Sequence, residues 1–162
     1  MKKALLVLFA AAATFAASAS NVKWGLTNGQ TLSDISAGNV YLIIGTVPEA
    51  SAFEKKESFA VADFGGEVFR QDSLTAGTFL SANESITSPV GTYSVFMAVI
   101  SSDGKTAAVS TQKNLKIAAA ATPSTLQWSS SNFTTYTAVP EPCSVALVLL
   151  GVAALGLKRK IA

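Results

Sequence analysis

The sequence predicts a mainly β fold, an antiparallel and sandwich-like domain with one short helix, flanked by an apolar segment at each end of the chain. Three observations support this fold class. Short runs of β-branched and aromatic residues recur between turn residues. An Asp-Gly pair separates two of these runs, which is the strongest local signal for a hairpin. Between the two end segments, only residues 49–61 have a composition that favours a helix. The chain of 162 residues has room for about one domain.

The N-terminal apolar segment has the three parts of an export signal. Lys2 and Lys3 precede ten apolar residues, 4–13, and Ala17-Ser18-Ala19 supplies the small-x-small pattern of a signal peptidase site. We therefore expect a signal peptide over residues 1–19, with Ala17 and Ala19 as the site residues and cleavage after Ala19. Ten apolar residues are too few for a membrane span, which needs about 20. The alternative is an uncleaved N-terminal anchor.

Residues 20–121 are predicted to form the β-rich exported domain. Its clearest strands are 39–44 and 93–100, which are apolar throughout, a pattern typical of strands covered on both faces. Weaker strand patterns cover residues 67–70, 78–80 and 115–117.

A hairpin is predicted at Asp103-Gly104, which joins 93–100 to a further strand over 106–111. The expected turn is type I′, in which both central residues have positive φ. Pairing outward from this turn places Ile100 opposite Ala107 and Ala98 opposite Val109.

The one predicted helix covers residues 49–61. Pro48 stands just before it, as favoured at a helix start, and Ala50, Phe53 and Lys55-Lys56 fit a helix. This helix is expected to pack on the sheet.

The stretch before the C-terminal segment is rich in Ser and Thr. These two residue types fill nine of the 16 positions from Thr122 to Thr137. We expect residues 122–138 to form an edge strand near 126–129 that merges into a polar linker.

Residues 139–162 form the C-terminal segment. Val139-Pro140-Glu141-Pro142 is held extended by its prolines. The 14 apolar residues 144–157 would make a helix of about 21 Å, shorter than the roughly 30 Å hydrocarbon core. Lys158-Arg159-Lys160 follows at once and is expected to stay cytoplasmic by the positive-inside rule.

This tail resembles the PEP-CTERM sorting domain of Gram-negative bacteria. The resemblance covers about 24 residues of 162 and none of the domain before them. It implies that Pro140, Glu141 and Pro142 are the sorting motif read by an exosortase, a membrane-embedded cysteine protease. It also implies that residues 145–157 are a transient inner-membrane anchor and that Lys158, Arg159 and Lys160 are the stop-transfer cluster. Family members are typically exported proteins of biofilm or exopolysaccharide matrices. The alternative is a permanent membrane anchor, and the role of Cys143 stays open.

Composition limits the chemistry of the chain. Without histidine, Ser-His-Asp and Cys-His catalysis and His-containing metal sites are excluded. The single cysteine, Cys143, cannot form an intrachain disulfide. Residues 20–139 carry seven Lys or Arg and nine Asp or Glu, a net charge of −2, so no basic patch for nucleic acid is expected. No catalytic residue, cofactor or metal is predicted. The carboxylate pairs Glu54 with Glu57 and Asp63 with Glu67 leave a surface hydrolase as an alternative.

Aromatic residues are the remaining candidates for binding. Sugars stack on exposed aromatic faces, so Trp24, Trp128 and Tyr136 are candidate glycan contacts. The alternative for the two tryptophans is that they close the core near the two ends of the domain.

Together these observations predict a non-enzymatic, exported and exosortase-sorted protein of the cell surface or extracellular polysaccharide matrix, with a structural or adhesive role. Its expected partners are signal peptidase and exosortase during export, the inner membrane, and exopolysaccharide as a candidate ligand. The first alternative is a carbohydrate-binding module held at the surface. The second is a permanently membrane-anchored surface protein.

Overall fold

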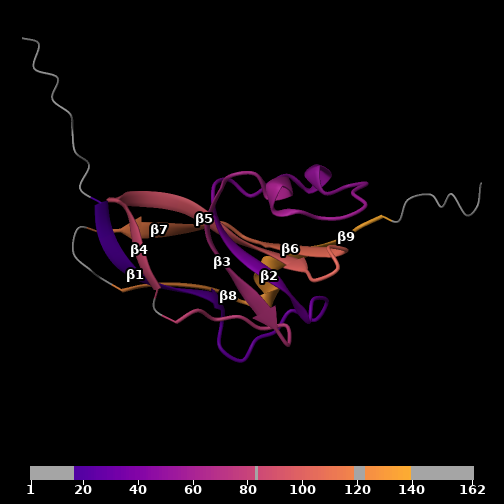
Figure 1. Ribbon diagram of the computed structural model, residues 1–162, viewed down its shortest axis with the longest axis horizontal. Helices are drawn as coiled ribbons and strands as arrows, with labels where there is room; N and C mark the ends of the chain where they lie inside the picture. Colours follow the sequence, from indigo (N-terminus) through magenta and orange to yellow (C-terminus); the bar gives the residue numbers. More distant parts are fainter. Residues whose placement is uncertain (1–16, 83, 119–122, 140–162) are drawn as a thin grey trace, which may run out of the picture.

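The computed structural model describes residues 17–82, 84–118 and 123–139, and within them the chain forms nine strands and three short 3₁₀ helices (Figure 1). The strands are β1 (Ala17–Leu26), β2 (Ala37–Ile44), β3 (Glu67–Thr75), β4 (Glu84–Pro89), β5 (Gly91–Ser101), β6 (Thr106–Ser110), β7 (Lys113–Ile117), β8 (Ser124–Trp128) and β9 (Phe133–Thr137). The 3₁₀ helices are η1 (Ala50–Ala52), η2 (Val61–Phe64) and η3 (Ser130–Asn132). The prediction of a mainly β fold is confirmed.

The strands form two sheets. One has three strands in the order β4-β1-β8, and the other has six, in the order β3-β2-β5-β6-β9 with β7 also paired to β5. All pairings are antiparallel except that of β1 with β8, which is parallel.

The long strand β5 organises the larger sheet. One of its edges pairs with β2, and the other pairs with β7 near its start and with β6 near its end. The chain leaves the ladder at Thr111 and Gln112, between β6 and β7. The strands predicted at 39–44, 93–100, 106–111 and 115–117 are therefore confirmed as β2, β5, β6 and β7.

The predicted β5–β6 hairpin is confirmed with its register, since Ile100 pairs with Ala107 and Ala98 with Val109. The predicted turn type is wrong. Gly104 has a φ of 68°, but Asp103 is not among the described residues with positive φ. The reason is local hydrogen bonding. The Asp103 carboxylate accepts bonds from the Ser101 hydroxyl at 2.6 Å and from the Lys105 N–H at 2.9 Å, which wraps a longer loop around this side chain.

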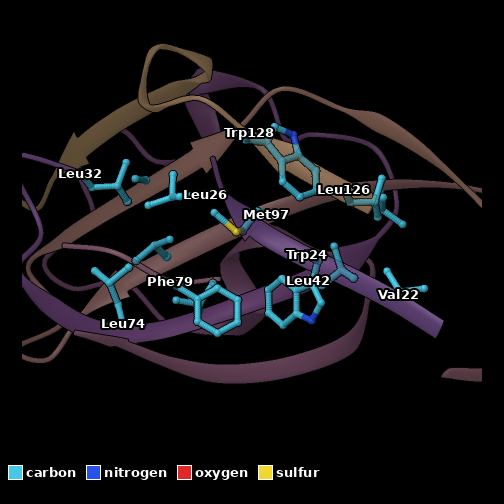
Figure 2. Close-up of a cluster of buried hydrophobic side chains, with 14 of the residues drawn as sticks. Val22, Trp24, Leu26, Leu32, Leu42, Leu74, Phe79, Met97, Leu126 and Trp128 are labelled. Atoms are coloured by element: carbon cyan, nitrogen blue, oxygen red, sulfur yellow. The ribbon is translucent and has the colours of Figure 1, made fainter. Parts of the chain in front are cut away.

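The main core contains residues from both sheets. Val22, Trp24 and Leu26 of β1 and Leu126 and Trp128 of β8 belong to the same buried cluster as alternate residues of β2 and β5. Figure 2 shows the two tryptophans with Met97 and Leu42 among them. All these side chains are at most 5% exposed.

A second core lies on the other face of the larger sheet. On β2, Val40 and Leu42 belong to the first cluster, whereas Tyr41 and Ile43 belong to the second. Because successive side chains of a strand point to opposite faces, β2 is covered on both sides, as its unbroken apolar sequence predicts. The second face is covered by the segment between β2 and β3, which contributes buried Phe53, Phe59 and Phe64.

This covering segment is not the predicted helix over 49–61. It contains only the 3₁₀ turns η1 and η2, and Lys55 has a φ of 61°. At 100° per residue, a helix would place Phe59 about 120° from the direction of Phe53 and could not bury both on one face. The spacing of the buried phenylalanines therefore overrides the helix-favouring composition.

Three further sequence predictions need correction. Residues 78–80 form only isolated bridges, Thr75 with Thr78 and Gly25 with Leu80, rather than a strand. Residues 133–137 form β9 within the larger sheet rather than a polar linker. The predicted edge strand near 126–129 is present as β8, two residues earlier. Strands β1 and β4 were not anticipated.

The predicted flanking segments fall largely outside the described residues, which exclude 1–16 and 140–162. Within the described part, no helix is both long and apolar enough to cross a membrane. The predicted cleavage site does fall in β1, where Ala17 pairs with Pro89 and Ala19 with Thr87. Cleavage after Ala19 would leave β1 beginning at Ser20, opposite Ile86.

Candidate functional site at the edge of β9

The two tryptophans proposed as glycan contacts are core residues. Trp24 and Trp128 are both 0% exposed, and Trp24 packs on Phe79 with ring centroids 4.6 Å apart. The Trp128 Nε1–H donates to the Thr111 carbonyl at 2.7 Å. The glycan-contact hypothesis is therefore wrong for these two residues, because their rings fill the core and leave no face for a sugar. The alternative, that they close the core, is confirmed.

Tyr136, the third aromatic candidate, is half-buried on β9. Its ring lies against Phe53, with centroids 4.4 Å apart and an interplanar angle of 30°. Phe53 therefore occupies part of the Tyr136 ring surface that a sugar would need.

The predicted sorting residues Pro140, Glu141 and Pro142 and the predicted stop-transfer residues Lys158, Arg159 and Lys160 lie outside the described residues. The chain just before them is held by backbone hydrogen bonds. Ala138 N–H donates to the Lys105 carbonyl and Val139 N–H to the Lys56 carbonyl, both at 2.8 Å. The predicted sorting motif thus begins at the first residue after a docked strand end.

Asp63, one of the candidate catalytic carboxylates, has both oxygens engaged. One accepts from the Lys56 ammonium at 2.6 Å and the other from the Ala60 N–H at 2.8 Å. Burial raises the pKa of Asp63, but these two hydrogen bonds and the charge of Lys56 outweigh it, so the pKa lies below its ordinary value. A carboxyl group held ionised in this way is suited to fixing the covering segment rather than to donating a proton.

Metal binding has no candidate in the described part of the chain, where no group of three or more Cys, Asp or Glu side chains is placed to hold an ion.

The edge of β9 is the most distinctive surface among the described residues. Two hydrogen bonds at the ends of the strand show which of its residues bond to β6. Thr111 N–H donates to the Asn132 carbonyl, and Ala138 N–H donates to the Lys105 carbonyl. Because hydrogen-bonded and non-hydrogen-bonded pairs alternate in an antiparallel ladder, Thr134 and Tyr136 direct their backbone groups toward β6. Phe133, Thr135 and Thr137 direct theirs away from the sheet.

Two shallow depressions flank this edge, and Thr135 lines both of them. One, of about 410 Å³, lies on the face of the larger sheet that covers the main core, and Phe133 and the loop carrying Leu32 line it. The other, of about 420 Å³, lies on the face that carries the second core, and Tyr136 and Phe53 line it. Space is therefore open on both faces of the strand edge.

The outer side of β9 pairs with no other strand in the described ranges. Phe133 N–H is engaged locally, since it donates to the Ser130 carbonyl. The covering segment contacts β9 through Phe53, whose ring lies against Tyr136. Its backbone hydrogen bond in this region lies beyond the end of the strand, from Val139 N–H to the Lys56 carbonyl. The open edge thus runs from Phe133 to Thr137.

Comparison with known proteins found no match for this chain, whether among family models, curated proteins or solved structures.

The sequence contains a strand pattern at this edge, although the surrounding residues are rich in Ser and Thr. Phe133-Thr134-Thr135-Tyr136-Thr137 consists only of residues with high β-propensity. Its Ser/Thr-rich surroundings led to the linker assignment, whereas strand propensity alone would have identified it.

Proposed function

We propose that this chain is an exported, exosortase-sorted structural or adhesive protein of the cell surface or extracellular polysaccharide matrix of a Gram-negative bacterium. One observation carries the proposal. The Pro140-Glu141-Pro142 motif is followed by the apolar run 145–157 and then by Lys158-Arg159-Lys160. The export-signal pattern of residues 1–19 supports it, since both signals are needed for the same route.

The domain between the signals is suited to such a role. We assign its two sheets to the sandwich-like class, in which a rigid core presents strand edges and loops to the surroundings. The 28 buried hydrophobic residues in the described part of the domain give it a core that requires no disulfide. In this proposal signal peptidase removes residues 1–19 during passage through the inner membrane. Residues 145–157 then hold the protein there until exosortase cuts near Pro142.

The intact mass of the mature protein from its native host tests this proposal. In cells with exosortase, we expect an N-terminus at Ser20 and loss of the residues after Pro142. In cells without exosortase, we expect the N-terminus at Ser20 and an intact C-terminal segment. In cells that contain exosortase, the Glu141→Gln variant should keep its C-terminal residues, as the wild type does in cells that lack the enzyme. The control Ser131→Ala, an exposed position in η3, should be processed like the wild type. A C-terminus still ending in Lys-Ile-Ala in all strains would show that the tail is a permanent anchor and would overturn the sorting role.

A further inference from the structure

We propose that the edge of β9 is a self-association site, at which a second copy of this chain adds its own β9 antiparallel to the first. The structural feature that carries this proposal is an open strand edge whose unpaired backbone groups match those of its own copy. It deepens the adhesive role proposed above, but it depends only on the domain.

The backbone groups along the edge are self-complementary. A two-fold axis at Thr135 pairs Thr135 with its counterpart and Phe133 with Thr137 of the other copy. These residues are the ones that direct their N–H and C=O groups outward. Each Thr135 would exchange both of its hydrogen bonds with the other Thr135. Each Thr137 N–H would meet the Phe133 carbonyl of the other copy, and no bond inside one chain would be broken.

The electrostatics of the edge permit this pairing. No charged residue occurs from Ile117 to Pro140, so two copies bring no like charges together along β9. Threonine and aromatic residues also form favourable pairs across neighbouring strands.

The opposite edge of the same sheet is protected. β3 carries Glu67, Arg70 and Asp72, and charged residues on an edge strand oppose pairing with another chain. The edge of the smaller sheet at β4 ends in Pro89, and its Ser85 carbonyl accepts a bond from Arg70 at 3.1 Å.

The second edge of the smaller sheet, β8, is also partly covered. The Lys113 ammonium donates to the Gln127 carbonyl and lies 5.5 Å from the centre of the Trp128 ring. β7 pairs only with β5 and leaves a further outer edge, which carries Lys113 and Lys116. Of these five outer edges in the described ranges, β9 therefore lacks the features that keep the others from pairing.

Space for the second copy is present on both faces. Side chains of an added strand alternate between the two faces of a sheet, and the depressions of about 410 and 420 Å³ lie one on each face beside Thr135. A contact of five residues per copy is small, so we expect association to be weak and to become significant where copies are crowded.

Disulfide trapping in the full-length chain tests the pairing directly. Thr135→Cys in a Cys143→Ser background places two cysteines opposite one another, about 5.5 Å apart between Cα atoms, within the range that a disulfide spans. The matched control is Thr134→Cys in the same background, which the two-fold axis places opposite Tyr136 rather than itself. Both chains keep the apolar tail, so association through the tail would affect them equally.

With oxidised glutathione, we expect a covalent dimer from the Thr135→Cys chain and at least about tenfold less from the Thr134→Cys chain. A second pair of variants removes the interaction instead of trapping it. Thr135→Lys sets two ammonium groups directly opposite one another and should raise the dissociation constant measured by sedimentation about tenfold, whereas Thr134→Lys should change it by about twofold or less.

Equal cross-linking from positions 134 and 135, unchanged association of the Thr135→Lys chain, or trapping of the Thr135→Cys chain on a different host protein would each overturn the proposal. The sorting proposal is judged separately, because its test measures the mass of the mature protein and not its association. A protein can fail either test and pass the other.

Discussion

At the scale of single residues, Ala76 adopts a backbone conformation that alanine disfavours. Its φ is 51°, and that of Gly77 is 71°. Thr75 N–H bonds the Thr78 carbonyl at 3.2 Å, and the reverse bond is 3.0 Å, so Ala76-Gly77 is a two-residue turn of the type I′ kind. The type I′ geometry predicted for the turn at Asp103-Gly104 is therefore found at Ala76-Gly77.

Ala76→Asn should raise the free energy of unfolding by about 0.5–1 kcal/mol, because asparagine tolerates the left-handed region and Asn-Gly is the preferred pair for this turn. Urea denaturation measures the effect. Gly77→Ala is the opposing control and should destabilise the fold, since its Cβ would lie 2.7 Å from the Leu32 carbonyl oxygen. Equal midpoints for Ala76→Asn and wild type would contradict the predicted strain.

Asp63 fixes the segment that covers the second core, and its contribution to the free energy of unfolding should depend on pH. Asp63→Asn should cost about 1 kcal/mol at pH 7, because asparagine keeps an acceptor for Ala60 but loses its charge toward Lys56. The pKa of Asp63 falls on folding, so its stabilisation is present above the ordinary value of 3.8 and is lost as the pH falls through the lower folded value.

Urea denaturation of wild type and Asp63→Asn between pH 7 and pH 2.5 checks this dependence. The two unfolding free energies should differ at neutral pH and converge in acid. A difference that stays constant down to pH 2.5 would show that the substitution acts through packing and not through charge.

At the scale of elements, the residues between β6 and β7 connect the two sheets by a hydrogen bond. The Thr111 carbonyl, released from the ladder, accepts the Nε1–H of Trp128 from β8. Trp24 on the neighbouring strand β1 is equally buried, but its Nε1–H has no partner within the described residues. Two tryptophans in one core thus differ in a single hydrogen bond.

Trp128→Phe should therefore destabilise the domain by about 1 kcal/mol more than Trp24→Phe does. Both substitutions remove a similar ring area, but only Trp128→Phe leaves a formed hydrogen bond unmade, whereas Trp24→Phe removes an unsatisfied donor. The comparison uses the free energy of unfolding from urea titrations of both variants. A greater loss for Trp24→Phe would contradict the assignment of the bond to Trp128.

The elements that the sequence predicts correctly are those whose pattern is local. β2 and β5 are continuous apolar runs, and the β5–β6 register follows from where Asp103-Gly104 divides two such runs. Elements determined by distant contacts were missed. β4, which contains Ser85 and Ser88, is polar in isolation, and β1 overlaps the apparent cleavage site. Lys55 shows the same limit, since its local composition favours a helix, which the burial of Phe53 and Phe59 against the distant strands of the larger sheet prevents.

The candidate sites show a similar division. Trp24 and Trp128 are of the residue type on which sugars stack. Only the folded structure, in which β1 pairs with β8, shows that both rings are buried. The β9 edge depends on which strand ends the sheet, and no sequence pattern reports that order. The proposed sorting motif is the reverse case, because the argument for it rests entirely on the sequence around Pro140-Glu141-Pro142.

At the scale of the whole molecule, the two ends of the described chain lie at opposite ends of its long axis (Figure 1). β1 begins at one end, and the chain leaves β9 at the other. Ala138 is buried, and the backbone bonds of Ala138 and Val139 hold the chain to Lys105 and Lys56 up to the residue before Pro140. Under the sorting proposal, an exosortase would therefore have to work directly beside the folded domain.

This closeness predicts that distance from the domain limits the rate of processing. Insertion of Gly-Ser-Gly-Ser between Val139 and Pro140 moves the motif by up to about 13 Å and should speed loss of the C-terminal segment about threefold or more, as followed by pulse-labelling and mass. The same insertion between Asn28 and Gly29 is the control, because it lengthens an exposed turn that has no hydrogen bond to Ala138 or Val139 among the described residues. Identical rates for both insertions would mean that the enzyme reaches the motif without hindrance, whereas slower processing with the spacer would mean that it also contacts the end of β9.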